Sequence, residues 1–193
     1  MPRTEEQNIQ IREKTKTVIL DAALRLFAKK GFHGTSISDI AKEAGVSKGL
    51  AYNYFESKIA IAEGIIQSMV KMGAELAEKF KVPEEPYDKL KVLLDLSFDF
   101  LKVNEDYWKL ILSFSLQPDV IDYALKLSRG FNDKLLHDIE DIMKKLKVKN
   151  PAMEARLLGA MVDGASLHYI FDKDSVDLDK YKKAILKKYK PQN

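Results

Sequence analysis

The chain has 193 residues, of which 46% are hydrophobic and 32% are charged. It is long enough for one large domain or two small ones, and it is too apolar for an intrinsically disordered protein. The lack of cysteine excludes disulfide scaffolds, thiolate metal sites and cysteine nucleophiles. No stretch approaches the roughly 20 apolar residues that span a bilayer, and residues 1–6 lack the apolar core of a signal peptide. We therefore expect a soluble, cytoplasmic protein with no membrane partner.

Charge and chain-breaking residues divide the chain near residue 58. Residues 1–58 hold ten Lys and Arg against seven Asp and Glu, whereas residues 59–193 hold 22 of each kind. The formal net charge of +3 therefore lies entirely in the first third. Four of the nine glycines fall within residues 31–49, where short elements need tight turns, and longer segments follow. We expect two domains, residues 1–58 and residues 59–193.

Helix-forming residues dominate the chain and alternating strand patterns are scarce, which predicts an all-α fold with nine helices. The first helix is expected at 9–30, with Gly31 as its stop. The second begins at Ser36, where Asp39 completes a weak capping box, and it ends at Gly45. The third follows the cap candidate Ser47 and ends near residue 54. The remaining helices are expected at about 58–80, 87–103, 107–116, 119–146, 152–171 and 178–189.

Residues 31–58 hold the most informative pattern. Two helices of about two turns each, joined through Ala44-Gly45-Val46-Ser47, have the length and turn composition of a helix-turn-helix at about residues 36–55. Gly45 permits the left-handed turn conformation. The apolar contacts that hold the two helices are expected from Ile37, Ile40, Ala41, Val46, Leu50 and Phe55.

The outward face of the third helix suits a DNA duplex. Its N-terminus presents unpaired backbone N–H groups, which favour phosphate. Lys48 can reach a phosphate or a guanine edge, and Gly49 lets the backbone approach closely. Asn53 bears an amide of the kind that pairs with adenine in the major groove. Tyr52 and Tyr54 bear hydroxyls at the reach expected for phosphate oxygens.

Taken in order, the residues of this segment form a dense pattern. It reads Gly31-Phe32-x-x-Thr35-Ser36, then Ile40-Ala41-x-x-Ala44-Gly45-Val46-Ser47-x-Gly49-x-x-Tyr52-x-Tyr54-Phe55-x-x-Lys58. Over residues 31–58 this pattern resembles the signature of TetR-type transcriptional regulators, and beyond residue 65 the resemblance is faint. Family members often have His where Tyr54 stands, so a phosphate contact there rests on a hydroxyl. By resemblance, the DNA-contacting residues are Thr35, Ser36, Ser47, Lys48, Gly49, Tyr52, Asn53, Tyr54 and Lys58.

The resemblance also implies a function for the whole chain. It implies a ligand-responsive regulator, most often a repressor, whose carboxy-terminal helices bind a small effector and form a homodimer. The amino-terminal domains of the two chains, called the heads, would enter successive major grooves of double-stranded DNA, so the operator should be a near-palindrome. No cofactor is expected.

Apolar residues recur at helical spacing throughout residues 59–193, which first indicates the core of a helical bundle. An apolar pocket with few polar anchors would suit a hydrophobic or aromatic effector. Each pocket candidate can equally be an ordinary core residue, and the sequence does not choose. The candidates are Phe98, Trp108, Phe114, Tyr123, Phe131, Met161 and His168.

Small residues within residues 152–171 allow another helix to approach closely, within the chain or across a two-fold axis. We favour an intermolecular four-helix arrangement of 152–171 and 178–189, with an ordinary buried helix as the alternative. The expected interface residues are Ala155, Gly159, Val162, Leu167, Ile170 and Ile185.

No enzymatic constellation emerges from the sequence. It has no GxGxxG, no P-loop and no HExxH, and its three histidines lie far apart without metal-ligand spacing. We therefore expect no catalytic residue, no metal site and no enzymatic activity. Two rival readings remain, an all-α enzyme and a ligand-binding homodimer whose DNA head has lost its function. Lys48, Tyr52 and Lys58 are all present, which argues against the second rival.

Overall fold

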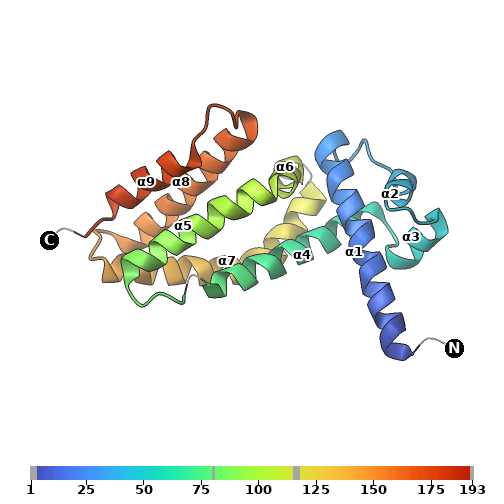
Figure 1. Ribbon diagram of the computed structural model, residues 1–193, viewed down its shortest axis with the longest axis horizontal. Helices are drawn as coiled ribbons and strands as arrows, with labels where there is room; N and C mark the ends of the chain where they lie inside the picture. The colour runs from blue at the N-terminus through green and yellow to red at the C-terminus, as the bar shows by residue number, and fades with distance from the viewer. Residues whose placement is uncertain (1–3, 80, 115–117, 192–193) are drawn as a thin grey trace. The chain divides into compact units, whose positions relative to one another are not determined.

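The computed structural model describes residues 4–79, 81–114 and 118–191, and within these ranges all regular structure is helical. The nine helices found there confirm the expected all-α class (Figure 1). Their bounds are α1 (Glu5–Lys30), α2 (Ile37–Glu43), α3 (Lys48–Tyr54), α4 (Lys58–Lys79), α5 (Pro86–Val103), α6 (Glu105–Phe114), α7 (Pro118–Lys145), α8 (Pro151–Phe171) and α9 (Leu178–Lys188). The helix ends expected at Phe80 and Leu116 lie outside the described residues.

Local hydrogen bonds explain where the first helices begin. Ser36 Oγ accepts a hydrogen bond from the backbone N–H of Asp39, and the Ser36 N–H donates to the Asp39 carboxylate, at 3.1 and 3.0 Å. These bonds confirm the capping box. The Ser36 hydroxyl also donates to the Asp39 carboxylate at 2.6 Å, and this bond, together with that from the Ser36 N–H, lowers the pKa of Asp39. α1 begins four residues earlier than expected, because Thr4 and Gln7 form a second capping box.

The chain forms two compact units. Unit 1 comprises Met1–Met69 and Asp106–Leu127, and unit 2 comprises Val70–Glu105 and Ser128–Asn193. Unit 1 contains α1, α2 and α3, and unit 2 contains α5, α8 and α9, while α4 and α7 contribute residues to both. Residues 59–69 and 106–127 therefore group with the amino-terminal head, beyond the boundary expected at residue 58.

Aromatic rings and the inner face of α1 form the core of unit 1. Phe27 and Phe32 lie 5.2 Å apart between ring centroids, and both contact Phe114 of α6, at 6.0 and 5.7 Å. The buried side chains of this inner face include Ile19, Ala22, Ala23, Leu26 and Phe27, whereas Val18 is 38% exposed. This core positions the short helices: α2 packs against α1, and α3 packs against α2.

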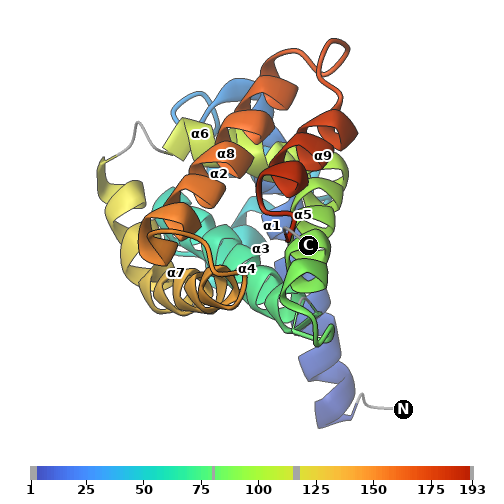
Figure 2. The same cartoon turned by 90° about the vertical axis from the view of Figure 1, so that its left-hand side faces the viewer.

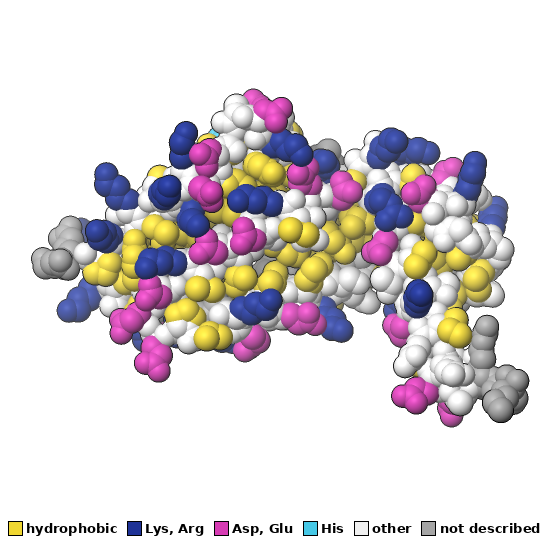
Figure 3. Space-filling view, in the orientation of Figure 1, with side chains coloured by type: hydrophobic (Ala, Val, Ile, Leu, Met, Phe, Trp, Pro, Cys, Tyr) yellow, Lys and Arg dark blue, Asp and Glu magenta, His cyan; other side chains and the backbone are white. Residues whose placement is uncertain are grey.

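Helices α5, α8 and α9 pack against one another in unit 2, as Figures 1 and 2 both show. Leu94 and Leu101 of α5, together with Leu158 of α8, are fully buried. The Tyr87 hydroxyl donates a hydrogen bond to the Leu186 carbonyl at 3.2 Å and thereby joins α5 to α9. Over the face of unit 2 seen in Figure 3, basic and acidic side chains are interspersed.

The described residues contain neither a candidate membrane span nor a candidate metal site. No helix there is long and apolar enough to cross a membrane. No group of three or more His, Asp and Glu side chains within these ranges is arranged to hold a metal ion.

Candidate nucleic-acid interface

A tight turn holds α3 at a fixed position relative to α2. Gly45 adopts the left-handed conformation with φ at 68°, and the N–H of Val46 donates to the Ala41 carbonyl at 3.0 Å. Ser47 then caps α3, because its hydroxyl accepts the N–H of Leu50 at 3.1 Å. Each element of the turn agrees with the helix-turn-helix expected from the sequence.

Apolar side chains secure α2 and α3 on their inner sides. Ile37, Ile40 and Ala41 of α2 are buried, as are Ala51 and Phe55 at α3. Leu50, expected among these contacts, instead has 38% of its surface exposed. The reason is geometric: Leu50 and Ala51 point about 100° apart on the helix, so burying Ala51 turns Leu50 outward.

Five of the residues expected to contact DNA share one exposed surface, which we call the α3 face. These residues are Ser47, Lys48, Gly49, Tyr52 and Asn53, and each of them is exposed. The α3 face combines one ammonium group, one amide, one phenol and the first-turn backbone of a helix. Tyr54, at the last position of α3, is half-buried, and Ser36 is exposed at the start of α2.

Gly49 stands out because the fold does not need a glycine there. Within the part of the chain that the structure describes, a Cβ atom built at Gly49 would meet no heavy atom within 4 Å, and the Gly49 backbone is helical. In contrast, a Cβ at Gly64 of α4 would lie 3.0 Å from Leu20 and 3.2 Å from Phe55. Gly64 is therefore a packing residue, whereas the open space at Gly49 permits a partner to approach the backbone closely.

Both tyrosines of α3 lie next to a cation. The Lys48 ammonium is 6.0 Å from the centroid of the Tyr52 ring, and the Arg12 guanidinium carbon is 5.9 Å from that of Tyr54. Such cation–π contacts favour a defined orientation of the ring. Arg12 belongs to α1 and was not among the expected site residues, since nothing in the sequence relates position 12 to position 54.

Thr35 does not offer its side chain to DNA, which corrects the expected contact. Only 2% of Thr35 is exposed, because its hydroxyl donates to the Gly31 carbonyl at 2.9 Å and to the Leu26 carbonyl at 3.3 Å. Gly31 is the C-cap residue of α1, and Leu26 lies about one turn before the end of this helix. Thr35 therefore closes the C-terminus of α1.

Lys58 is likewise engaged within the fold and does not face outward to a phosphate. Its ammonium donates to the carbonyls of Phe32 and Thr35, at 2.6 and 2.9 Å, and lies 4.5 Å from the centroid of the Phe32 ring. The first residue of α4 thus secures the segment between α1 and α2. Its three donors suit it to this structural role.

The seven effector-pocket candidates fall in both units and have different surroundings. Three of them belong to unit 1, where Phe114 lies in the aromatic core. The Tyr123 hydroxyl accepts a hydrogen bond from the Gln67 side chain at 2.7 Å. The Nε1 atom of Trp108 is buried and has no hydrogen-bond partner among the described residues. In unit 2, Phe98 is buried in the core and Met161 is half-buried. His168 is exposed, with Nδ1 3.1 Å from the Tyr181 hydroxyl.

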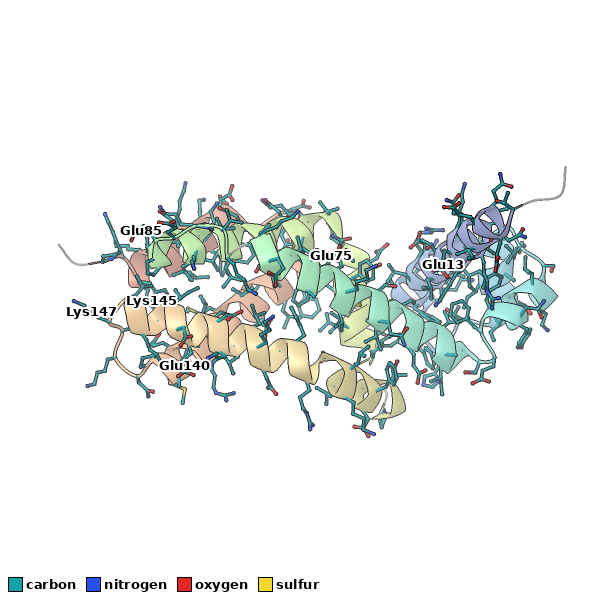
Figure 4. All side chains as sticks on the ribbon, turned by 90° about the horizontal axis from the view of Figure 1, so that it is seen from below. Glu13, Glu75, Glu85, Glu140, Lys145 and Lys147 are labelled. Atoms are coloured by element: carbon teal, nitrogen blue, oxygen red, sulfur yellow. The ribbon has the colours of Figure 1, made fainter. Side chains whose placement is uncertain are left out.

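Phe131, the remaining candidate, lines a groove in unit 2. The groove has a volume of about 280 Å³ and lies between the end of α4 and the middle of α7, the two helices nearest the viewer in Figure 4. Lys81 at its rim pairs with Glu78 at 2.8 Å and with Asp138 at 3.9 Å. The apolar part of its lining consists of Ala74, Ala77, Phe131 and Leu135.

The expected dimer residues separate into two groups. Ala155 of α8 and Ile185 of α9 are buried within the chain, so little of either side chain is left to contact a partner chain. The other four, Gly159, Val162, Leu167 and Ile170, are half-buried. Apolar side chains that the expectation did not include are exposed on α8, namely Met153, Leu157 and Phe171.

Comparison with known proteins gives consistent matches. Residues 19–65 match the family model described as bacterial regulatory proteins, tetR family. The HTH-type transcriptional regulator BetI of Pseudomonas fluorescens is 30% identical over 170 residues, which cover 83% of this chain and 84% of that protein. BetI of Brucella canis is 24% identical over 182 residues, covering 92% of this chain and 88% of that protein.

Solved structures share the fold over nearly the whole chain. The transcriptional regulator FadR from Bacillus subtilis, in complex with stearoyl-CoA, matches with a TM-score of 0.78 and 19% identity, over 90% of this chain and 96% of that one. A transcriptional regulator from Saccharomonospora viridis, in complex with choline, matches with a TM-score of 0.76 and 22% identity, over 92% and 95%. At these identities the likeness shows the fold alone.

Proposed function

Because the chain belongs to the TetR family of bacterial regulatory proteins, we propose that it is a homodimeric repressor that leaves its DNA operator when a small effector binds. The observation that carries this proposal is the α3 face, where the exposed side chains have the chemistry of DNA recognition. Such a regulator acts in the cytoplasm, where its DNA lies.

The proposed contacts follow from the position of each group. The capped N-terminus of α3 directs backbone N–H groups toward a phosphate, and Gly49 allows the approach. Lys48 contacts a phosphate or a guanine edge, and Asn53 reads a base in the major groove. Because Thr35 and Lys58 are engaged within the fold, the proposed contact set is Ser36, Ser47, Lys48, Gly49, Tyr52, Asn53 and Tyr54.

Two heads are needed for specific binding. A net charge of +3 per chain is too small to hold a protein on DNA without regard to sequence. A homodimer would place two α3 helices in successive major grooves about one helical turn apart, so the operator is a near-palindrome. The exposed apolar side chains of α8, Met153, Leu157 and Phe171, support this helix as the dimer face.

We propose that the effector binds among the carboxy-terminal helices. We also propose that the effector is a hydrophobic molecule. The groove beside Phe131 supports this assignment, since its floor is apolar and its rim bears charged groups. FadR from Bacillus subtilis was solved with stearoyl-CoA, a ligand with a long apolar chain. The effector would release DNA only to the extent that it binds the released conformation more tightly than the DNA-bound one.

Selection of bound duplexes from a random-sequence library tests the proposal without knowledge of the operator. The chain should enrich a near-palindromic sequence, and gel shift should then give a specific complex with that duplex. The Lys48→Ala variant should bind it more weakly and remain dimeric. Salt-sensitive binding without any sequence preference would contradict the proposed function.

A further inference from the structure

The first ten residues of α1 lie outside the packed core of unit 1. Residues 5–14 are all exposed, including Ile9 at 58% and Ile11 at 43%, and side chains of α1 become fully buried only at Ile19. Figure 1 shows these N-terminal turns extending past α2 and α3. A helical segment without tertiary packing is only marginally stable in water, so this stretch has little structural reason to persist.

Arg12 lies within this stretch and brings a positive charge to the end of the α3 face. Its guanidinium carbon is 5.9 Å from the ring centroid of Tyr54, the last residue of α3. No carboxylate of the described residues forms an ion pair with Arg12, and the adjacent Glu13, labelled in Figure 4, points about 100° away around the helix. The guanidinium is therefore available to an anion outside the chain.

Arg25, on the same helix, differs from Arg12 because its guanidinium forms an ion pair within the chain. Its Nε lies 3.5 Å from the Glu43 carboxylate, and its side chain is about half exposed. Among the described residues, Arg12 has no such partner. The N–H donors of the Arg12 guanidinium lie in the plane of that group, so contact with the face of the Tyr54 ring leaves them able to form hydrogen bonds.

We infer that Arg12 binds a DNA phosphate outside the helix-turn-helix, so that the DNA interface extends from α3 onto the first turns of α1. The inference rests on the proposed DNA-binding function. A phosphate is the expected acceptor, because a guanidinium matches two phosphate oxygens, and phosphates flank the bases that α3 would read. Contact with Tyr54 positions the guanidinium before DNA arrives.

The salt dependence of binding provides the test. Affinity for the duplex that the wild-type chain selects is measured across a range of salt concentrations for wild type, Arg12→Ala, Arg12→Lys and the matched control Arg25→Ala. Each lost phosphate contact lowers the slope of log affinity against log salt by about 0.9, or about 1.8 for a dimer. Between about 50 and 200 mM salt, the affinity ratio of wild type to Arg12→Ala should therefore shrink about tenfold.

The variants separate a phosphate contact from a structural effect. Arg12→Lys should keep most of the slope because it keeps the charge, and Arg25→Ala should match wild type. An Arg12→Ala variant that binds more weakly by the same factor at every salt concentration would show that Arg12 only orients Tyr54, and the inference would be wrong. Failure of the wild type to select any sequence would instead overturn the proposed function, and the inference with it.

Discussion

The Lys58 ammonium lies 2.6 Å from the carbonyl oxygen of Phe32 and 4.5 Å from the centroid of the same residue's ring. One side chain at the start of α4 thus satisfies a carbonyl in the turn after α1 and contacts the aromatic core of unit 1. It also donates to the carbonyl of Thr35, whose hydroxyl closes the C-terminus of α1. Lys58 and Thr35 together hold the segment from which α2 begins.

Replacing Lys58 by Met should therefore destabilise the head. The variant keeps most of the aliphatic chain but leaves two carbonyls without a charged donor, which should lower the free energy of unfolding by about 1–3 kcal/mol. Urea denaturation measures this loss. Lys48→Met is the matched control, because Lys48 is exposed: its stability should stay within about 0.5 kcal/mol of wild type while its DNA affinity falls. Wild-type stability in Lys58→Met would show that the two hydrogen bonds contribute nothing.

Two glycine substitutions should have opposite effects. Gly49→Ala should leave the protein as stable as wild type or more stable by about 0.5–1 kcal/mol, since alanine favours helix and meets no neighbour. The same variant should bind DNA more weakly, because the methyl group occupies the space for the duplex. Gly64→Ala should be destabilised, because its Cβ would press on Leu20 and Phe55. Thermal unfolding and gel shift on both variants check the pair, and undiminished DNA binding by Gly49→Ala would contradict close approach at that position.

The features of this fold that sequence reasoning identified are local ones. Ser36 with Asp39 and Ser47 with Leu50 form caps within three residues along the chain, and Gly45 forms its turn with immediate neighbours. Such hydrogen bonds depend on residue type and spacing, so the sequence is enough to predict them. The capping box of Thr4 and Gln7 has the same spacing and could have been found in the same way.

Contacts between distant residues were not predictable in this manner. Thr35 and Lys58 have side chains suited to a phosphate, and only the packing of α1 against the following turn shows that carbonyls engage them instead. Ala155 of α8 and Ile185 of α9 have the size and apolarity of interface residues, yet both are buried within the chain, where α5, α8 and α9 pack together. Arg12 lies 42 positions before Tyr54, so its role depends entirely on how α1 crosses α3.

The carboxylate of Glu154 should make stability depend on pH. It accepts hydrogen bonds from Lys188 at 2.8 Å and Tyr189 at 2.9 Å, and these bonds lower the pKa of Glu154 below its ordinary value of 4.5. A carboxyl group with a depressed pKa stabilises the fold above the unfolded pKa, and this stabilisation is lost as pH falls through the folded pKa. Glu154→Gln should therefore be less stable than wild type by about 1 kcal/mol at neutral pH, and the difference should vanish below the folded pKa.

Chemical denaturation over a series of pH values measures this difference. Glu75→Gln is a suitable control, because Glu75 is an exposed residue of α4 that forms no ion pair among the described residues (Figure 4). Its stability should follow the wild-type curve at every pH. A constant difference between Glu154→Gln and wild type down to strongly acidic pH would show that the charge of Glu154 is not the stabilising factor.

Leu157 of α8 provides the test of the dimer, because 43% of this apolar side chain is exposed. If α8 meets a second copy, Leu157→Asp would place an unpaired charge in the interface, and the mass in solution should fall from twice 22.0 kDa to 22.0 kDa. Leu125→Asp is the control, since Leu125 of α7 is 53% exposed and should tolerate a charge without loss of the dimer. A monomer binds one half-site, whereas a dimer binds two at once and therefore holds the operator more tightly. The affinity of Leu157→Asp for the operator should thus fall by roughly a hundredfold or more. Sedimentation and gel shift on the same samples give both readouts, and a Leu157→Asp variant that stays dimeric would exclude this part of α8 from the interface.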